Sequence, residues 1–441
     1  MNLGRSLLSA SIAPETGLEV FPSELDLDVI RRALEATGTA TIRRRKLPAE
    51  SVVWIVVGMG LFRDRSIQDI VRHLNLVLPD AKGPKGRVSG AAIVQARDRL
   101  GAEPLAALFG DTADNWTRAS AHEHRWRGLA VYGIDGTTLR IPDTEANDAA
   151  FGRPGASRGR AAYPQVRVVA TMVLRSHLLA AVEFGPVASS ELKLAAKLLP
   201  QIPDDSVTLI DRGFVSYKFF HDLQAGGKNR HWLTRAKAKL KLPVFKRLGH
   251  GDQLVELPIN RNLHRLHPEL PKTLQVRAIR YQRRGFRPQT LLTSLLDPNL
   301  YPAAEMADLY HERWELEIGF DEIKTHTLER EETLRSHAPE RVRQELWGLA
   351  ISYNLVRLEM EKAALHLGLP PSRIGYRASL LMIRNFWLAA WQLETGNLPR
   401  RLEILHDDVA LNVLPPRRDR RYPRAVKIKM SNYPLKRKGL K

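Results

Sequence analysis

Apolar positions along the first quarter of the chain recur with the spacing of α-helices. Ser23, Ser66 and Ser89 stand directly before such segments, where a hydroxyl can cap the first turn of a helix. Ser66 and Asp69 also have the spacing of a capping box. We therefore expect residues 1–120 to form a helical N-terminal domain. The helices expected in it cover residues 24–36, 49–61, 67–78 and 90–100.

The last two of these helices are joined by a loop rich in Gly, Pro and Lys, residues 81–87, and have the order helix, turn, helix. The second helix carries Gln95, Arg97 and Arg99, whose side chains are suited to contacts with DNA. The same residues also fit the solvated basic face of an ordinary helical bundle, because sequence specifies helix-turn-helix geometry only weakly. Both interpretations are open at this point.

From about residue 125, the helical spacing gives way to short apolar runs that are typical of buried strands. Asp135 follows the first run and Asp211 follows the fourth. Three strands, a helix, a fourth strand and a helix, with an acid after the first and fourth strands, are similar to the ribonuclease-H-like α/β arrangement. A Gly/Arg-rich loop, residues 151–164, is expected to be mobile. The expected strands cover residues 129–134, 166–174, 178–184 and 207–210, and the expected helices cover residues 191–199 and 216–223.

A second group of strands separates Asp211 from the helical segments that follow it. We expect this β-rich block to be an insertion into the α/β core. Its strands are expected at residues 232–234, 253–259, 274–281 and 290–296, and further helices start at Pro339 and cover residues 377–394. The predicted domains are residues 1–120, a helical N-terminal DNA-binding domain; 121–224 and 301–370, a ribonuclease-H-like catalytic core; 225–300, a β-rich insertion domain; and 371–441, a helical C-terminal region with a basic tail.

Residues 310–324, YHERWELEIGFDEIK, hold no Pro and many strong helix formers, so we expect them to form a single helix. At about 100° per residue, one face of this helix carries an aromatic hydroxyl, a guanidinium, a carboxylate and an ammonium. An adjacent apolar stripe can bury the helix against a core. The alternative is a charged helix face that is merely solvated. The polar set is Tyr310, Arg313, Glu317 and Lys324, and the apolar set is Leu309, Leu316, Phe320 and Ile323.

The formal net charge of +20 indicates a polyanionic partner, and nucleic acid is the commonest one. The segment after Pro415 holds eleven basic residues against one acid, a net +10. Such a tail favours contact with nucleic acid over a purely solubilising role. The chain has no Cys, no secretory signal and no apolar run long enough to span a bilayer, so we expect a cytoplasmic protein without a membrane partner. The candidate DNA contacts in the tail are Arg417, Arg418, Arg420 and Arg421.

Asp135, Asp211 and Glu317 are three carboxylates of the kind that bind Mg²⁺, a hard cation that prefers oxygen ligands. Three carboxylates can hold two such ions about 4 Å apart around a phosphodiester, one at the attacking oxygen and one at the leaving oxygen. Mn²⁺ suits the same ligands. Each acid alone is a weak signal, because Asp-Gly after a strand is more often just a turn.

A four-residue signature and two acid motifs of this chain resemble those of the DDE transposases of insertion sequences, in the insertion-sequence-four group. The signature of that group is Y-(2)-R-(3)-E-(6)-K. The helical N-terminal domain, the β-rich insertion and residues 334–354 are also similar to parts of that group, so the resemblance covers most of the chain. The matching residues are Tyr310, Arg313, Glu317 and Lys324 for the signature, Asp135-Gly136-Thr137 for the first acid and Asp211-Arg212-Gly213-Phe214 for the second.

This resemblance implies an enzyme that cuts and rejoins DNA at the terminal inverted repeats of an insertion element, by cut-and-paste and through hairpin ends. It implies that the three acids bind the catalytic Mg²⁺ or Mn²⁺. It also implies that Tyr310, Arg313 and Lys324 contact phosphates of the DNA end. The implied partner is double-stranded DNA, both inverted repeats and target, with a protein dimer on the paired ends.

Two alternatives to a transposase are open: a related metal-dependent nuclease that cuts without joining strands, and a catalytically inactive copy that only binds DNA. Hairpin formation also displaces a base, which an aromatic side chain can stabilise by stacking. Trp232, the only Trp of the insertion block, is the candidate for this contact with DNA. Its alternative role is that of a core Trp on a strand.

Overall fold

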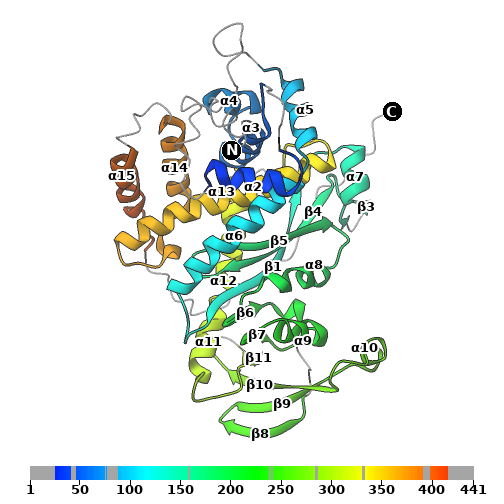
Figure 1. The fold of residues 1–441 in the computed structure, drawn as a ribbon. Helices are drawn as coiled ribbons and strands as arrows, with labels where there is room; N and C mark the ends of the chain where they lie inside the picture. The colour runs from blue at the N-terminus through cyan, green and yellow to red at the C-terminus, as the bar shows by residue number, and fades with distance from the viewer. Residues whose placement is uncertain are drawn as a thin grey trace, which may run out of the picture.

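The chain is described here by a computed structural model in which one nine-stranded sheet carries helices on both faces (Figure 1). Ser23, the loop 81–87 and the basic tail with Arg417, Arg418, Arg420 and Arg421 lie outside the described residues. The structure describes residues 25–40, 46–74, 76, 88–156, 159–237, 240, 242–283, 287–329, 333–390 and 398–415.

Five strands at one end of the sheet follow the order β5-β4-β1-β6-β7. The first three are antiparallel neighbours, whereas β6 runs parallel to β1 and β7 runs parallel to β6. The four strands expected before Asp211 are all present, and β1 is longer than expected because its pairing with β4 continues to Arg140. The bounds are β1 Ala130–Arg140, β4 Gln165–Val173, β5 Leu179–Pro186, β6 Ser206–Ile210 and β7 Arg230–Arg235.

The expected insertion is joined to the core without a break in the sheet. Its first strand, β7, pairs in parallel with β6, so the block expected to start at residue 225 continues the sheet of the core. The antiparallel strands β11, β10, β9 and β8 continue the same sheet from β7. Neither β8 nor α10 was expected. The residues of β8 are mostly exposed and mix apolar with basic side chains, so they show no strand pattern. The bounds are β8 Val244–Gly249, β9 Asp252–Pro258, β10 Thr273–Tyr281, β11 Gln289–Thr293 and α10 Arg261–Leu266.

The N-terminal helices form close to the expected positions, with two corrections. α2 begins at Leu27 rather than at residue 24, because Asp26 caps it and accepts a hydrogen bond from the amide of Val29 at 2.8 Å. α4 begins with the expected Ser66 cap but ends at His73, and residues 75, 77 and 78 of the expected helix lie outside the described residues. The bounds are α2 Leu27–Ala36, α3 Ala49–Leu61, α4 Ile67–His73, α5 Gly90–Leu100 and α6 Glu103–Glu123.

The long helix α13 joins the N-terminal helices to the rest of the molecule. It packs against α3, α6, α14 and α15 and contacts β5 (Figure 1). Gly348 of α13 lies where α3 crosses it, and a Cβ atom there would be 2.6 Å from the carbonyl oxygen of Val56. The two helices therefore touch backbone to backbone. Its buried side chains include Leu346, Leu349, Tyr353, Val356 and Met360. The bounds are α13 Pro339–His366, α14 Tyr376–Ala390 and α15 Leu398–Ala410.

Alternate side chains of β1 face opposite layers of helices, as the strand period of two requires. Ile134 packs in one core cluster with residues of α8 (Glu191–Leu198), and Tyr132 packs with Ala121 of α6. A Cβ atom on Gly133 would instead meet Leu316, on the other side of the sheet. Asp135 is two residues after Gly133, so its side chain lies on the same side of the sheet as Leu316.

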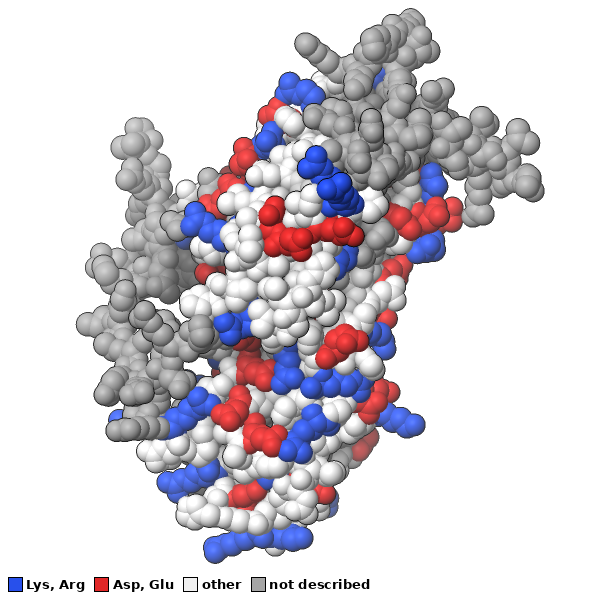
Figure 2. Space-filling model, turned by 90° about the vertical axis from the view of Figure 1, so that its left-hand side faces the viewer, with Lys and Arg blue, Asp and Glu red and all other residues white. Residues whose placement is uncertain are grey.

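The described surface carries both signs of charge. Basic and acidic side chains are interspersed over the described part of the face in Figure 2, so the excess of basic residues does not gather into one patch there. Within the described ranges, no helix combines the length and the apolar content needed to cross a bilayer.

Candidate active site

Asp135, within β1, and Asp211, directly after β6, occupy equivalent positions on two neighbouring parallel strands. β1 and β6 pair from Ala130 with Ser206 to Ile134 with Ile210, and each acid is the next residue of its chain segment. Neighbouring strands lie about 4.8 Å apart, so both acids lie at the same edge, where the parallel pairing ends. Asp211 also caps the short 3-10 helix Arg212–Phe214, and its Oδ2 accepts a hydrogen bond from the amide of Gly213 at 3.2 Å.

The segment 310–324 is not the single helix expected from its composition. A break separates α11 from α12, and a π-helical turn follows α12 directly. Glu312, at the break, is held by Arg175, whose Nε and NH2 groups donate to its two carboxylate oxygens at 2.9 and 2.8 Å. The polar residues of the segment are therefore divided among α11, α12 and the π turn, although Glu312 and Arg313 keep helical backbone angles and Arg313 still shares a face with Glu317. The bounds are α11 Ala303–His311, α12 Trp314–Asp321 and the π turn Glu322–Thr327.

Arg313 lies at this break and connects two of the three acids. Its NH2 group donates to Oε1 of Glu317 at 2.8 Å, and its NH1 group lies 3.6 Å from Oδ2 of Asp135. The Arg313 side chain is only 15% exposed, whereas that of Glu317 is 43% exposed. The guanidinium therefore stands between a carboxylate of the sheet and a carboxylate of α12, and Glu317 faces the same site as Asp135.

Two glycines let α12 approach the sheet closely. A Cβ atom on Gly133 of β1 would lie 2.6 Å from Cδ1 of Leu316, and one on Gly319 would lie 2.4 Å from Cε of Met172 on β4. This contact supports Glu317 on a rigid base. The expected apolar stripe of the segment is buried, as predicted, at Leu309, Leu316, Phe320 and Ile323.

Tyr310 and Lys324 lie on either side of α12 along the chain and differ in exposure. Tyr310 is 8% exposed, and its hydroxyl lies 3.5 Å from the carbonyl oxygen of Ile210, the residue before Asp211. Burial raises the pKa of Tyr310, so the phenol keeps its proton and remains a donor. Lys324 is partly exposed on the π turn. Their contacts with DNA phosphates stay a prediction.

Trp232 is a core residue, which corrects its candidate role in stacking on a DNA base. Its side chain is fully buried and stacks on Phe220 with ring centroids 3.9 Å apart. Its Nε1 group donates to Oε1 of Gln224 at 3.0 Å. The indole therefore has no free face for a base, and the alternative role expected from the sequence is correct.

Arg97 is also buried, which removes one of the side chains expected to face DNA. It is 3% exposed, and its Nε and NH2 groups donate at 3.1 Å to Gln344 and Ser336. Arg97 thus ties α5 to α13 and to the segment before it. Gln95 and Arg99 are exposed on the same helix.

The carboxyl of Asp135 is the most perturbed acid of this site. Burial raises its pKa to about 6, although the amide of Gly136 and the Arg313 guanidinium act in the opposite direction. Asp211 and Glu191 raise it further through their negative charge. Glu191 was missed by the sequence analysis because only the fold brings the first turn of α8 to β1.

The raised pKa predicts that Asp135→Asn stabilises the metal-free protein. The folded-state pKa, about 6, exceeds the ordinary value of 3.8, so the folded chain binds the proton more tightly and stability falls as pH rises between these values. Asparagine removes the charge and this penalty, which is about 1–3 kcal/mol above pH 6. We expect a higher thermal unfolding midpoint for Asp135→Asn at pH 8 in EDTA.

The gain should shrink as the pH approaches 4, because the wild-type carboxyl then becomes protonated. Asp321→Asn is the matched control, since Asp321 is an exposed carboxylate of α12 and its neutralisation should change stability by no more than about 0.5 kcal/mol. A midpoint for Asp135→Asn that equals or falls below that of the wild type at pH 8 would contradict the expectation.

The donor atoms at the site suit a hard divalent cation, because all three candidate ligands are carboxylate oxygens. The raised pKa of Asp135 also indicates a carboxylate that a nearby cation would stabilise. In the parts of the chain that the structure describes, no three His, Cys, Asp or Glu side chains are grouped closely enough to hold a metal ion. The guanidinium of Arg313 lies between Asp135 and Glu317.

Two family models match the chain. Residues 15–110 match the model described as "Insertion element 4 transposase N-terminal", and residues 126–355 match the model described as "Transposase DDE domain". Together they cover the N-terminal helices, the sheet and the first half of α13.

Two proteins of Escherichia coli (strain K12) are similar to this chain. "Transposase InsG for insertion sequence element IS4" is 40% identical over 412 residues, which are 93% of this chain and 92% of that protein. "Putative transposase InsZ" is 35% identical over 247 residues, which are 56% of this chain and 77% of that protein. A chain of the "Cryo-EM structure of piggyBac transposase synaptic complex with hairpin DNA (SNHP)" aligns with 92% of this chain and 87% of its own length, at 12% identity and a TM-score of 0.42.

Proposed function

The chain belongs to the insertion element 4 family of DDE transposases, and from this membership we propose that it cleaves and joins DNA at the terminal inverted repeats of an insertion element. As a DDE transposase it is an enzyme that acts on DNA. The finer proposal is a cut-and-paste reaction, with Asp135, Asp211 and Glu317 as the catalytic acids.

One observation carries the assignment of these acids. Asp135 and Asp211 follow paired residues of the parallel strands β1 and β6. Arg313 and Glu317 come from the α12 segment, and Arg313 connects Glu317 to Asp135. The strand order β5-β4-β1-β6-β7, with an acid within β1 and another directly after β6, supports a ribonuclease-H-like core. The antiparallel strands beyond β7 support an insertion that begins after residue 235.

A divalent cation held by Asp135, Asp211 and Glu317, Mg²⁺ or Mn²⁺, would supply Lewis acidity toward the phosphodiester and promote ionisation of the attacking hydroxyl. The side chains around the acids would position the DNA. Arg313 is suited to this role because a guanidinium binds phosphate oxygens in a bidentate manner. When the Arg313 guanidinium binds a DNA phosphate, it no longer bridges Asp135 and Glu317, and both carboxylates are freed. Lys324 adds a second cation.

The proposed reaction proceeds through hairpin ends. A nick frees a 3′ hydroxyl, which attacks the opposite strand; the hairpin is then opened and the 3′ end is joined to target DNA. Two ends must be held together for this reaction, so we propose that two copies of the chain act on a pair of ends. The alternatives are a nuclease that does not join strands and a copy that only binds DNA.

Cleavage of a linear DNA that carries both inverted repeats of the element tests this proposal. The protein is incubated with Mg²⁺ and a circular target, and a denaturing gel separates nicks, hairpins and joined products. The proposal expects all three classes of product. Cut ends that never enter the target would favour the nuclease, and bound but intact DNA would favour the inactive copy.

The basic tail supports a separate prediction about affinity. Removal of residues 416–441 takes away half of the formal net charge. Binding to DNA should weaken, and the slope of log affinity against log salt should become shallower by roughly 0.9 for each phosphate that the tail neutralises. Fluorescence anisotropy at several salt concentrations measures both. The matched variant replaces Arg417, Arg418, Arg420 and Arg421 by Gln in the full chain and should show part of the effect; an unchanged slope after deletion would contradict the prediction.

A further inference from the structure

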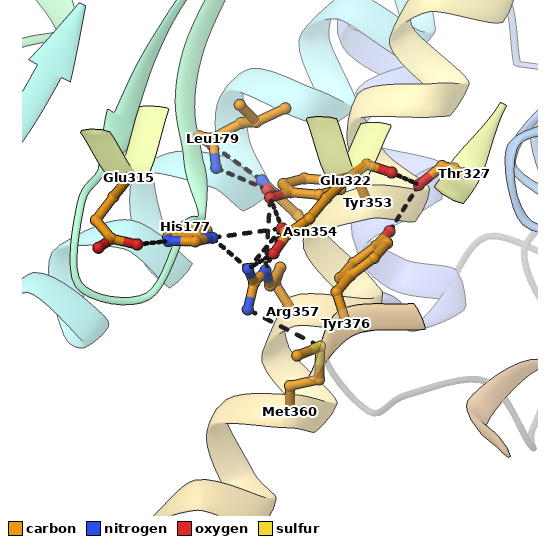
Figure 3. A network of polar contacts seen from close by, with 10 residues as sticks. All are labelled: His177, Leu179, Glu315, Glu322, Thr327, Tyr353, Asn354, Arg357, Met360 and Tyr376. Carbon is orange, nitrogen blue, oxygen red and sulfur yellow. Dashed lines mark hydrogen bonds and ion pairs between the residues drawn. The ribbon is translucent and has the colours of Figure 1, made fainter. Parts of the chain in front are cut away.

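A buried ionic network lies behind α12 and the π turn. Figure 3 shows side chains from the β4–β5 turn, α12, the π turn, α13 and α14 converging on Glu322 and Arg357. These segments are far apart in the sequence, so the network fixes several elements relative to one another. Two of them, α12 and the π turn, carry Glu317 and Lys324.

Arg357 and Glu322 form the centre of this network, with side chains that are 1% and 8% exposed. Arg357 donates to Oε2 of Glu322 from Nε at 3.1 Å and from NH2 at 2.5 Å. The hydroxyl of Tyr353 donates to the same oxygen at 2.7 Å. Burial alone would raise the pKa of Glu322, but Arg357 and His177 lower it to about 2, so the carboxylate is charged at neutral pH.

His177 connects Arg357 to α12, because its ring contacts both Arg357 and Glu315. The NH2 group of Arg357 contacts Nδ1 of His177, and Oε2 of Glu322 lies 3.3 Å from the same ring nitrogen. The carboxylate of Glu315 accepts, so the Nε2 group of His177 donates to its Oε2 atom, at 2.9 Å. Glu315 is thereby held on the buried side of α12.

Glu315 and Glu317 are two residues apart, so they project about 200° from each other around the helix axis. Glu315 is 8% exposed, whereas Glu317 is exposed and contacts Arg313. An anchor on Glu315 therefore sets the rotation of α12 about its axis. That rotation directs Glu317 toward Arg313 and Asp135.

The same network closes the π turn that follows. Thr327 donates from Oγ1 to the carbonyl oxygen of Glu322 at 3.1 Å, and its hydroxyl lies 2.7 Å from that of Tyr376. Single π turns within helices occur often at functional sites. Here the turn places Glu322 inside, against Arg357, and leaves Lys324 partly exposed.

Stability alone does not account for this arrangement. A buried ion pair often adds no more stability than well-packed apolar residues of the same volume, although the loss of one partner is strongly destabilising. His177 also adopts a left-handed backbone conformation, with φ of 65°. Residues keep such sparsely populated conformations when their surroundings impose them, most often at functional sites.

We propose that Arg357 and Glu322 are positioning residues for DNA cleavage: through His177 and Glu315 they hold α12 in the rotation that presents Glu317, and they hold the π turn that carries Lys324. This inference rests on the proposed function and extends it to residues that touch neither the DNA nor the three acids.

The test compares two double variants in the full-length protein. Glu322→Gln with Arg357→Met removes both charges at once, which avoids the buried lone charge that either change leaves by itself. Asp252→Asn with Arg277→Met is the control, because that pair has the same chemistry on β9 and β10, with side chains 10% and 0% exposed and bonds of 2.8 and 2.6 Å. The thermal unfolding midpoints of both double variants are measured first and compared with that of the wild type, to establish that both are folded.

Three quantities are then measured: the cleavage rate at saturating Mg²⁺, the Mg²⁺ concentration at half-maximal rate, and amide hydrogen exchange across the chain. For the Glu322/Arg357 variant we expect cleavage that is roughly 10 to 100 times slower, a several-fold higher half-maximal Mg²⁺ concentration, and faster exchange confined to residues 312–328. Misalignment of one catalytic group slows a reaction by a factor of about this size. The Asp252/Arg277 variant should match the wild type in all three.

A folded Glu322/Arg357 variant with wild-type cleavage and wild-type exchange at residues 312–328 overturns the inference and leaves the proposed function intact. Equal slowing of the two double variants also overturns it, because the effect is then one of general stability. Failure of the wild type to cleave in the same assay rejects the proposed function, and the inference with it.

Discussion

Glu317→Gln should abolish DNA cleavage while DNA binding is retained. Gln keeps the size of the side chain but removes the charge that a divalent cation requires. The expected loss of rate is at least about 10³-fold, which corresponds to about 4 kcal/mol of transition-state stabilisation. Affinity for the DNA end should stay within a few-fold of the wild type or increase, because the substitution removes a negative charge and releases Arg313 from its 2.8 Å bond. Single-turnover cleavage and anisotropy on the same DNA end give the two quantities.

Asp321→Asn is the control for this experiment. Asp321 is an exposed acid on the same helix, four residues after Glu317, and its Oδ1 accepts a hydrogen bond from Thr325 rather than facing Arg313. It should cleave DNA at close to the wild-type rate. Wild-type cleavage by Glu317→Gln would mean that Glu317 belongs to a solvated helix face, which is the alternative that the sequence left open.

Gly348→Ala should destabilise the protein at the contact between α3 and α13. The added methyl group would lie 2.6 Å from the carbonyl oxygen of Val56 and 2.7 Å from its Cγ1 atom, so one helix backbone must move. Overpacking of this kind costs about 1–3 kcal/mol, and the helix propensity that Ala adds recovers less than about 1 kcal/mol of it. The thermal unfolding midpoint should fall by about 1–2 °C, because the unfolding entropy of a chain of this length is large.

Gly110→Ala makes the same chemical change where no neighbour obstructs it. Gly110 lies inside α6, and a Cβ atom there meets nothing within 4 Å. The substitution should therefore raise stability, by up to about 1 kcal/mol. Equal effects at Gly348 and Gly110 would show that α3 and α13 are not in backbone contact.

Most of the architecture follows from local patterns in the sequence. α3 and α5 have the expected bounds, α5 with the expected Ser89 cap, and the strands around Asp135 and Asp211 form where the apolar runs lie. These elements are predictable because each buries its own apolar residues. The parallel register that sets the two acids side by side is a property of the sheet, so the sequence supports it only by resemblance to a known fold.

The site residues were predicted from the family signature, and the structure changes how they are arranged. A sequence without Pro gives no sign of the break at Glu312, because Arg175, more than a hundred residues earlier in the chain, holds it. The spacing of apolar residues also does not predict that Arg97 is buried, because its partners are distant in the sequence: Gln344 on α13 and Ser336 just before it. Long-range polar contacts of this kind override the local preference in each case.

The measurement that tests the central claim most directly is an anomalous diffraction map of the protein bound to an end of the element and soaked in Mn²⁺. The account predicts anomalous density within ligand distance of Asp135, Asp211 and Glu317, with Arg313 turned from these carboxylates to a phosphate. Bound DNA without Mn²⁺ at these acids, and with Arg313 still bridging Asp135 and Glu317, would contradict it.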